Sequence, residues 1–289
     1  PFKNRKEDIM EKTIKKYFPI FALPTAAAFT VFFIFPFIMG VYLSFCSFTT
    51  VKDAKWIGFS NYAKIWGDPT FVHALWYTAL FSIIAVVSIN VLAFAIALLL
   101  TKGIKGTNIF RTVFFMPNLI GGIVLGYIWQ LIFNGILARY DLTLTFSEKY
   151  GFWGLVILLN WQQIGYMMII YIAGIQNVPG DLIEAAKIDG ASKFQILKNV
   201  TIPMVMPSIT ICTFLTLTNA FKLFDQNLAL TAGNPSNRSE LLALNIYNTF
   251  YGRNGWEGVG QAKAVVFFIL VAVIAIIQLR ATRSKEVQQ

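Results

Sequence analysis

Charged side chains are scarce in this chain. Only 13% of its 289 residues are Asp, Glu, Lys or Arg, whereas 56% are hydrophobic and the mean hydropathy is +0.62. Soluble domains carry about 25% charged residues, so this composition excludes an ordinary soluble protein and indicates an integral membrane protein. The net charge of +10 comes from basic residues between apolar runs, without the interleaved aromatic residues of a nucleic-acid-binding patch. We therefore expect no nucleic acid partner.

Motifs for site chemistry are also absent. The two cysteines, Cys46 and Cys212, lie in or beside apolar runs without metal-ligand spacing or a disulfide framework, so we expect packing residues and no metal site. The chain contains no G-x-x-x-x-G-K-[ST] motif, which predicts that it neither hydrolyses ATP nor binds a cofactor of its own. Nothing resembles a hydrolase triad or nucleophile elbow, and we predict no catalytic residue.

Long apolar runs are what the sequence has in abundance. A membrane-spanning helix needs about 20 mostly apolar residues. Six stretches meet or approach this length, namely Phe18–Phe45, Phe71–Leu100, Thr112–Phe133, Phe152–Ile175, Ile202–Phe224 and Val259–Leu279. These runs predict an all-α protein, a polytopic bundle of six transmembrane helices. Most of the 24 Lys and Arg residues fall on one face if the amino terminus is cytoplasmic, which predicts that both termini are cytoplasmic.

A polar island separates two of these runs, between Asn177 and Pro207. Asp181 and Glu184 have the spacing of a capping box for one short helix, and Ser192 and Gln195 have it for a second. Gly190 between them can adopt the left-handed backbone that often ends a helix. The sequence therefore predicts a helix, a glycine turn and a second helix on the cytoplasmic face.

The same island carries a resemblance to a known family. Glu184-Ala185-Ala186, followed by Gly190 and by Val200-Thr201-Ile202-Pro203, resembles the EAA loop of the membrane subunits of binding-protein-dependent ABC importers. Downstream, Leu230 to Pro235 reads LTAGNP and is similar to the LTxGGP of carbohydrate permeases in that family, with Asn234 in place of the second glycine. The stretch from Met116 to Asn134 also resembles the family, so the likeness covers most of the chain.

The resemblance implies a type I ABC importer permease that takes up sugars or oligosaccharides. It implies residues 1–17 as a cytoplasmic segment, 18–280 as the transmembrane permease domain with a coupling loop at 178–201, and 281–289 as a cytoplasmic tail. The partners it implies are a second permease subunit, expected to be a paralogue, two ATPase subunits that hold ATP and Mg, and an extracytoplasmic sugar-binding protein. The setting is a bacterial-type plasma membrane with its lipid. The residues expected to contact the ATPase are Glu184, Ala185, Ala186, Asp189 and Gly190.

Uncharged polar residues inside the apolar runs are the candidates for the substrate path, because amides and hydroxyls can hydrogen-bond sugar hydroxyls. They are Asn90, Gln130, Asn134, Asn160, Gln163, Tyr166, Thr216 and Asn219. Each has a competing interpretation, since polar side chains in membrane bundles commonly bond a neighbouring helix. Two other hypotheses stay open: a self-contained carrier or channel for a polar solute, and a membrane enzyme or scaffolding subunit.

Overall fold

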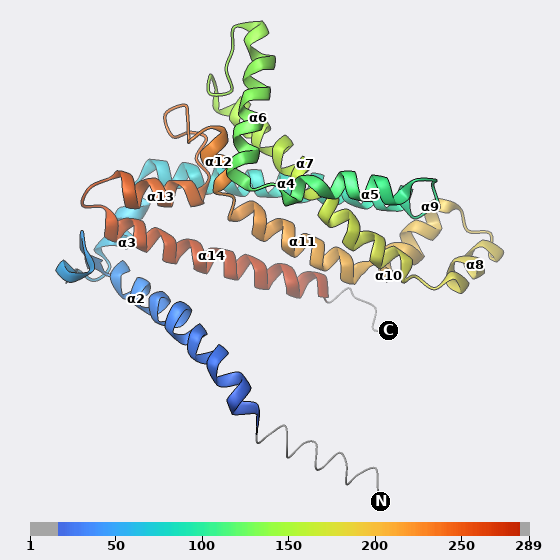
Figure 1. The fold of residues 1–289 in the computed structure, drawn as a ribbon, viewed down its shortest axis with the longest axis horizontal. Helices are drawn as coiled ribbons and strands as arrows, with labels where there is room; N and C mark the ends of the chain where they lie inside the picture. Colours follow the sequence, from blue (N-terminus) through green and yellow to red (C-terminus); the bar gives the residue numbers. More distant parts are fainter. Residues whose placement is uncertain (1–16, 284–289) are drawn as a thin grey trace, which may run out of the picture.

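The computed structural model describes residues 17–283, and the prediction of an all-α protein is confirmed (Figure 1). A two-residue antiparallel pairing of β1 with β2 matches Cys46 with Trp56. The elements are η1 (Thr30–Ile34), α2 (Phe35–Ser44), β1 (Cys46–Ser47), η2 (Val51–Asp53), β2 (Lys55–Trp56), α3 (Ser60–Trp66), α4 (Pro69–Leu100), α5 (Thr107–Phe115), η3 (Met116–Leu119), α6 (Gly122–Leu137), η4 (Ala138–Tyr140), α7 (Glu148–Gln176), α8 (Gly180–Ile188), α9 (Lys193–Ile196), η5 (Leu197–Thr201), α10 (Ile202–Met204), α11 (Met206–Phe221), α12 (Asp225–Leu230), α13 (Leu242–Gly252) and α14 (Glu257–Arg283). The predicted segment 1–17 and tail 281–289 lie largely outside the described residues.

The described residues contain five helices long and apolar enough to cross a membrane. They are Tyr17–Ser44, Pro69–Leu100, Gly122–Tyr140, Glu148–Gln176 and Glu257–Thr282. A sixth span results if Lys193–Met204 and Met206–Phe221, which meet at an angle of 71°, cross together. These segments correspond to the six apolar runs of the sequence, so the polytopic bundle is confirmed.

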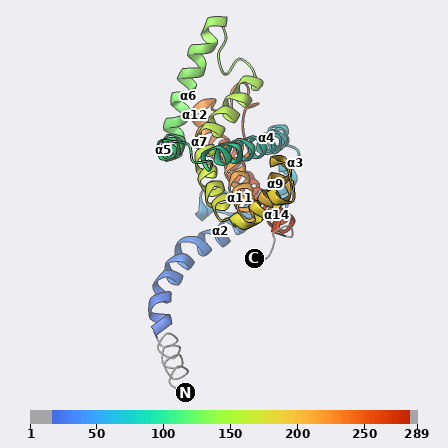
Figure 2. The ribbon, with the colours of Figure 1, turned by 90° about the vertical axis from the view of Figure 1, so that its right-hand side faces the viewer.

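The central helix of the bundle is α7. In its most apolar window 67% of the residues are buried, against 28% for α4 and 6% for Tyr17–Ser44. α4 and α11 both pack on α7, and α14 packs on α11 and α13. The helix Tyr17–Ser44 and helix α6 leave the bundle in opposite directions in both views (Figures 1 and 2). Two long helices therefore present most of their apolar surface outside the chain's own core.

The third predicted span, a single helix over Thr112–Phe133, is wrong in detail. α5 runs along the bundle beside α7 and stops at Phe115, and α6 begins at Gly122 and turns away (Figure 1). Pro117 lies in the intervening turn η3 and has no N–H for a helical hydrogen bond, which explains the interruption. The chain turns in direct contact with α7, where the Ile120 carbonyl accepts a hydrogen bond from Gln162 Nε2 at 3.3 Å.

Two other prolines follow a wide π-helical turn. In η1 the Phe35 N–H bonds the Thr30 carbonyl, one residue before Pro36, and in η5 the Ile202 N–H bonds the Leu197 carbonyl, one residue before Pro203. A proline in a helix loses its N–H bond and crowds the preceding turn, and the wider turn relieves that crowding. The distortion of the first helix therefore lies at Pro36, while residues 17–29, which include Pro19 and Pro24, remain helical.

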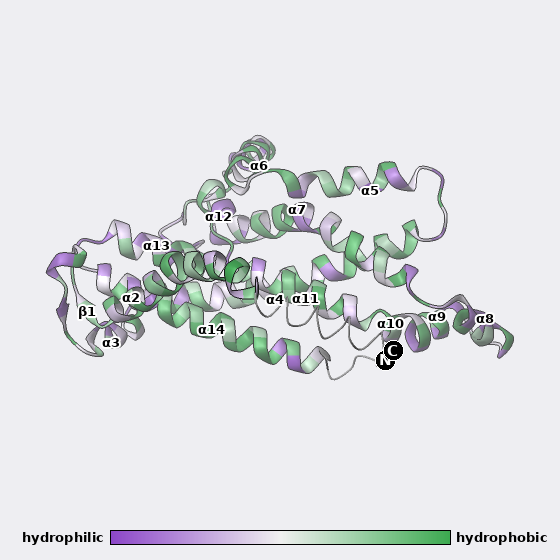
Figure 3. Cartoon of the chain, turned by 60° about the horizontal axis from the view of Figure 1, so that its bottom comes forward, coloured by the Kyte–Doolittle hydropathy of each residue, from purple (hydrophilic) through white to green (hydrophobic). Residues whose placement is uncertain are grey.

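Polar surface gathers at the two ends of the bundle. Figure 3 shows apolar colouring along α11 and α14, with more hydrophilic residues near β1 and α13 at one end and near α8 at the other. The segment 225–258 forms α12 against α6 and α13 against α4 and α14. It is part of the packed structure.

Candidate functional site

The predicted glycine turn of the polar island is confirmed in detail. Gly190 has φ +80° and donates its N–H to the Lys187 carbonyl at 3.1 Å, while the Ala191 N–H reaches the Ala186 carbonyl at 2.9 Å. These two hydrogen bonds form a Schellman motif, which satisfies the last carbonyls of α8. The turn therefore fixes the direction in which α8 points.

The two predicted capping boxes have different outcomes. Ser192 caps α9 and exchanges hydrogen bonds with Gln195, as predicted. The predicted cap at Asp181 is wrong, because α8 starts at Gly180 after Pro179 and no side chain caps it. Asp181 lies in the first turn instead, where its negative charge interacts favourably with the positive end of the helix dipole.

α8 and α9 expose apolar side chains at the end of the bundle. Ile188 is 86% exposed and Phe194 is 70% exposed, while Ile183 on the opposite side of α8 packs against the core. Glu184, Ala185, Asp189 and Gly190 are exposed and Ala186 is half-buried. Sequence reasoning selected the small and acidic residues and passed over Ile188 and Phe194, although an isoleucine and a phenylalanine in a polar island were a readable signal.

Three of the predicted path residues belong to hydrogen bonds between helices. Asn90 on α4 donates from Nδ2 to Thr216 Oγ1 on α11 at 2.9 Å, and its Oδ1 accepts from the Tyr171 hydroxyl on α7 at 2.6 Å. Asn160 on α7 donates to Ser88 Oγ on α4 at 2.9 Å. Asn90, Thr216 and Asn160 thus join the central helices, and the packing interpretation holds for these contacts.

Gln130 and Asn134 serve the segment around α6. Gln130 Nε2 donates to the Leu230 carbonyl at the end of α12 at 3.0 Å, and Asn134 Oδ1 accepts from the Leu144 N–H at 2.8 Å. Tyr166 is half-buried on α7, with its ring 6.4 Å from that of Phe115. The structure therefore does not bring these three residues into one site with the others.

Gln163 and Asn219 are the predicted path residues that share a cavity. Asn219 Nδ2 donates to Gln163 Oε1 at 3.3 Å, and both line a hollow of about 280 Å³ with Phe224 and Gln226. Lys222 and Asp225 line the same hollow, and no salt bridge joins these two described residues.

The cavity beside α12 has the mixture of groups that a sugar needs. Its amides offer donors and acceptors without a net charge, and Phe224 offers an aromatic surface. Gln226, which sequence reasoning missed, donates to Gln162 Oε1 at 2.7 Å and so holds α12 against α7. Because Gln163 lies near the middle of α7, the hollow is near the mid-depth of the most buried span.

The LTAGNP segment encloses a buried hydrogen-bond network centred on Asn227. Its Nδ2 donates to the Ser239 carbonyl at 2.8 Å and its Oδ1 accepts from the Leu241 N–H at 2.8 Å. Gly233 has φ +85°, whereas Asn234 is not among the residues of positive φ. Asparagine in place of the second glycine therefore requires no left-handed backbone, and the departure from the family pattern is tolerated locally.

A buried charge cluster stands near the opposite end of the bundle from α8. Lys263 on α14 is fully buried and donates from Nζ to Asp68 Oδ2 at 2.8 Å, to Asn245 Oδ1 at 2.9 Å and to Thr249 Oγ1 at 2.7 Å. Arg253 makes a second salt bridge to Asp68 at 3.0 Å. The cluster ties α4, α13 and α14 together.

Asp68 is ionised in this setting. Burial alone raises the pKa of its carboxyl, but hydrogen bonds from Lys263 and Thr70 outweigh that cost and hold the pKa at about 2. Sequence reasoning missed the pair because its members are 195 residues apart. A lysine inside the last apolar run was the available signal, since such a charge requires a partner.

Residues 89–284 match the family described as binding-protein-dependent transport system inner membrane component. The chain belongs to this family. It is 43% identical over 277 residues to the probable starch degradation products transport system permease protein of Thermoanaerobacterium thermosulfurigenes, covering 93% of this chain and 94% of that protein. It is also 28% identical over 275 residues to a trehalose/maltose transport system permease protein of Thermococcus litoralis, covering 90% and 92%.

Solved structures agree with the family assignment at the level of fold. A chain from a bacterial ABC transporter involved in the import of the acidic polysaccharide alginate aligns with a TM-score of 0.80 at 19% identity, covering 95% of this chain and 98% of that chain. The fold is therefore that of an ABC importer permease, as the EAA resemblance implied. This member of the family is a multi-pass inner membrane protein and a transport subunit.

Proposed function

We propose that this chain is one of two permease subunits of an ATP-driven importer that takes up oligosaccharides delivered by an extracytoplasmic sugar-binding protein. One observation carries the proposal: α8 stands at the end of the bundle with Ile188 and nearby Phe194 exposed and with its direction fixed by the Gly190 turn. An exposed apolar helix surface of this kind suits a groove in a partner protein. Glu184, Ala185, Ala186, Asp189 and Gly190 would form the rest of that contact.

The substrate class follows from the cavity and the relatives together. The relatives are named for starch degradation products and for trehalose and maltose, which are all saccharides. The hollow lined by Gln163, Asn219 and Gln226 beside Phe224 offers neutral hydrogen-bonding groups and one aromatic face. We assign this hollow to the sugar path, with Gln163 and Asn219 as the residues that hydrogen-bond the substrate.

The remaining partners follow from surfaces that the chain leaves open. The helix Tyr17–Ser44 and α6 bury only 6% and 11% of their apolar windows, which supports a second permease subunit, a paralogue, packed against them. ATP and Mg would be held by two ATPase subunits, and this chain would bind no cofactor. The α8 end and both termini would be cytoplasmic, in a bacterial-type plasma membrane.

Reconstitution tests the transport proposal. The chain is co-purified with the second permease subunit and the ATPase subunits, placed in proteoliposomes and assayed for uptake of maltooligosaccharides supplied with the binding protein. We expect uptake only when the ATPases, the binding protein and ATP are all present. Uptake by this chain alone without ATP would instead favour the self-contained carrier or channel.

Cysteine labelling tests the orientation. In intact cells an impermeant maleimide should label a cysteine at exposed Ser236 and should fail to label one at exposed Ser192. Membrane permeabilisation should make the second site reactive, which controls for burial in the complex. Labelling of the Ser192 position alone in intact cells would invert the topology.

A further inference from the structure

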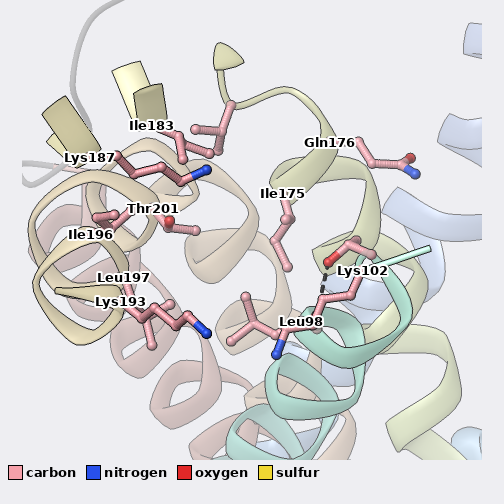
Figure 4. A pocket seen from close by; sticks show the side chains of 12 residues that line it. Leu98, Lys102, Ile175, Gln176, Ile183, Lys187, Lys193, Ile196, Leu197 and Thr201 are labelled. Atoms are coloured by element: carbon pink, nitrogen blue, oxygen red, sulfur yellow. Dashed lines mark hydrogen bonds between the residues drawn. The ribbon is translucent and has the colours of Figure 1, made fainter. Parts of the chain in front are cut away.

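A second hollow lies at the α8 end of the bundle, far from the proposed sugar path. It has a volume of about 680 Å³ and is enclosed by the ends of α4 and α7 on one side and by α8 and α9 on the other (Figure 4). α4 ends at Leu100 and α7 ends at Gln176, and both are candidate membrane spans. The hollow is therefore at the level where membrane helices meet lipid head groups.

The walls of this hollow combine two chemistries. Leu98, Ile175, Ile183 and Ile196 give it an apolar floor, and Val178 extends that floor toward α8. A small soluble anion would leave these side chains wet. A ligand with a hydrocarbon part and a polar head would cover the floor and reach the rim.

The rim of the hollow is basic. Lys102 follows α4, Lys187 lies on α8 and Lys193 begins α9, and Figure 4 shows their side chains reaching toward the hollow from its two sides. No aspartate or glutamate lines the hollow, and none of the three lysines forms a salt bridge within residues 17–282. Three uncompensated ammonium groups above an apolar floor complement one anionic amphiphile.

We propose that this hollow binds an anionic phospholipid, with the phosphate between Lys102 and Lys193 and the start of an acyl chain against Leu98 and Ile175. Basic pockets between membrane helices are suited to anionic head groups, because lysines near the surface attract them and the helices shield the contact from water. The cytoplasmic leaflet is implied by the orientation proposed above, on which this placement rests. A lipid bound here joins α4 and α7 to α8–α9, and so supports the helix assigned to ATPase contact.

The test compares two pairs of lysine substitutions in the purified complex. Lys102→Gln with Lys193→Gln removes two charges from the rim and leaves α8 intact. Lys105→Gln with Lys198→Gln is the control, since both lysines are exposed near the same end and neither lines the hollow. Each complex is placed in nanodiscs of equal amounts of phosphatidylcholine and phosphatidylglycerol, delipidated with mild detergent, and analysed for retained lipid by native mass spectrometry.

We expect the parent and the control pair to retain phosphatidylglycerol. The affinity of the rim pair for this lipid should be lower than that of the parent by about tenfold or more. Equal retention by the rim pair and the control pair would overturn the site, as would retention of phosphatidylcholine in the same amount. Inorganic phosphate is added in a parallel arm, and displacement of the lipid at millimolar phosphate would assign the hollow to a soluble phosphate ligand instead.

The binding measurement is independent of transport. If the complex retains phosphatidylglycerol through Lys102 and Lys193 but carries no sugar, the proposed function fails and the lipid site stands. If the complex carries sugar and all variants retain lipid equally, the lipid site fails and the proposed function stands.

Discussion

Lys263 illustrates how a charge can be kept inside an apolar helix. Its ammonium is fully buried and makes three hydrogen bonds at 2.7–2.9 Å, so the donors that water would satisfy are satisfied by Asp68, Asn245 and Thr249. Removing two ions from water is costly, and the cost is recovered only with such complete pairing. The cluster therefore contributes more to specifying how α4, α13 and α14 pack together than to the net free energy of folding.

Asp68→Asn tests this interpretation. Asparagine keeps the helix cap that Asp68 provides through the Thr70 N–H, but it removes the carboxylate that Lys263 contacts directly, so that Glu240, linked to Lys263 through Asn245, is the remaining buried carboxylate of the cluster. We expect a loss of about 3–5 kcal/mol in stability, measured as a lower unfolding temperature of the purified complex. Adding Lys263→Met should restore most of the loss, because the buried charge is then gone. A double variant as unstable as Asp68→Asn alone would contradict the pairing.

The same cluster predicts a pH dependence. The folded-state pKa of Asp68 is lowered from its ordinary 3.8 to about 2, so its contribution to stability is present above about pH 4 and is lost as the pH falls through about 2. The stability difference between the parent and Asp68→Asn should therefore be constant from neutral pH to about 4 and should shrink below it. A difference that already shrinks well above pH 4 would show that Asp68 is not held as the carboxylate.

The pairing of Asp68 with Lys263 also marks a limit of sequence reasoning. Asp68, Pro69 and Thr70 form a readable helix start, and Lys263 is visible as a charge in the last apolar run. Which acid neutralises it depends on α4 and α14 lying side by side. One sequence contains no signal for that long-range contact, whereas local signals such as the Ser192 capping box and the Gly190 turn were predicted correctly.

At the scale of elements, the close contact of the end of α5 with α7 depends on one glycine of α7. A Cβ on Gly165 would overlap the backbone carbonyl of Phe114, so the last turn of α5 rests directly on α7. Sequence reasoning expected an unbroken helix here because the apolar run is continuous and Pro117 was not treated as a break. Small residues permit such close approach of helix backbones in membrane bundles.

Gly165→Ala should consequently destabilise the chain by about 1–3 kcal/mol, because neither backbone can move without disturbing its helix. Gly135→Ala is the matched control, since a Cβ at Gly135 on α6 meets nothing within 4 Å. The control should be neutral or slightly stabilising, as alanine is the better helix former. The measurement is the unfolding temperature and yield of each variant in detergent. Equal behaviour of both variants would contradict the close approach of α5 to α7 at Gly165.

α8 gives a second prediction at this scale, concerning coupling. Gly190 has φ +80° and open space around its Cβ position, so Gly190→Val is disfavoured by backbone strain alone, by about 1–3 kcal/mol. Gly180→Val controls for bulk, because Gly180 is exposed, also has open space and lacks a positive φ. Ala186→Glu leaves the turn intact and places a charge on the half-buried side of α8.

Gly190→Val and Ala186→Glu should weaken ATPase retention or uncouple ATP hydrolysis from uptake, with normal membrane insertion. Both sites are remote from the hollow around Gln163. The assays are co-purification of the ATPases, ATP hydrolysis and sugar uptake by reconstituted complexes. If both variants keep their ATPases and transport at the parental rate, the contact assigned to Glu184–Gly190 is wrong.

At the scale of the whole molecule, the chain leaves much of the apolar surface of its membrane-spanning helices uncovered. Its own core surrounds α7, while Tyr17–Ser44 and α6 extend outward with most of their apolar surface uncovered (Figure 2). The approximate number of spans was predictable because each needs a long apolar run, but the limits of the third span and the bend before α11 were not. How far each span lies from the core was not predictable either, since periodicity is weak in helices that are apolar on every side.

The energy source gives the last prediction. The most buried charged side chains among the described residues are Lys263, Glu240 and Asp68. Lys263 and Asp68 form a salt bridge near one end of the bundle, and Glu240 accepts hydrogen bonds from Asn245 and Asn248. The mid-depth hollow is lined by three amides, by Lys222 and Asp225, and by apolar side chains. A proton-driven carrier needs a titratable group that alternates between the two sides of the membrane. Asp225 is the carboxylate that lines the hollow, so it is the group through which a proton could be coupled to a sugar bound there.

We therefore expect sugar uptake by proteoliposomes of the complete complex to be unchanged by a protonophore while internal ATP is held constant. Asp225→Asn can weaken sugar binding, because it alters the lining of the hollow, but the variant should be as insensitive to the protonophore as the parent. ATP hydrolysis is measured in the same samples, so that a direct effect of the protonophore on the ATPases is detected. The proposal would be contradicted if parental uptake collapsed with the proton gradient at constant ATP while the Asp225→Asn variant did not respond to the protonophore. Uptake would then be driven by protons through Asp225 and not by ATP hydrolysis.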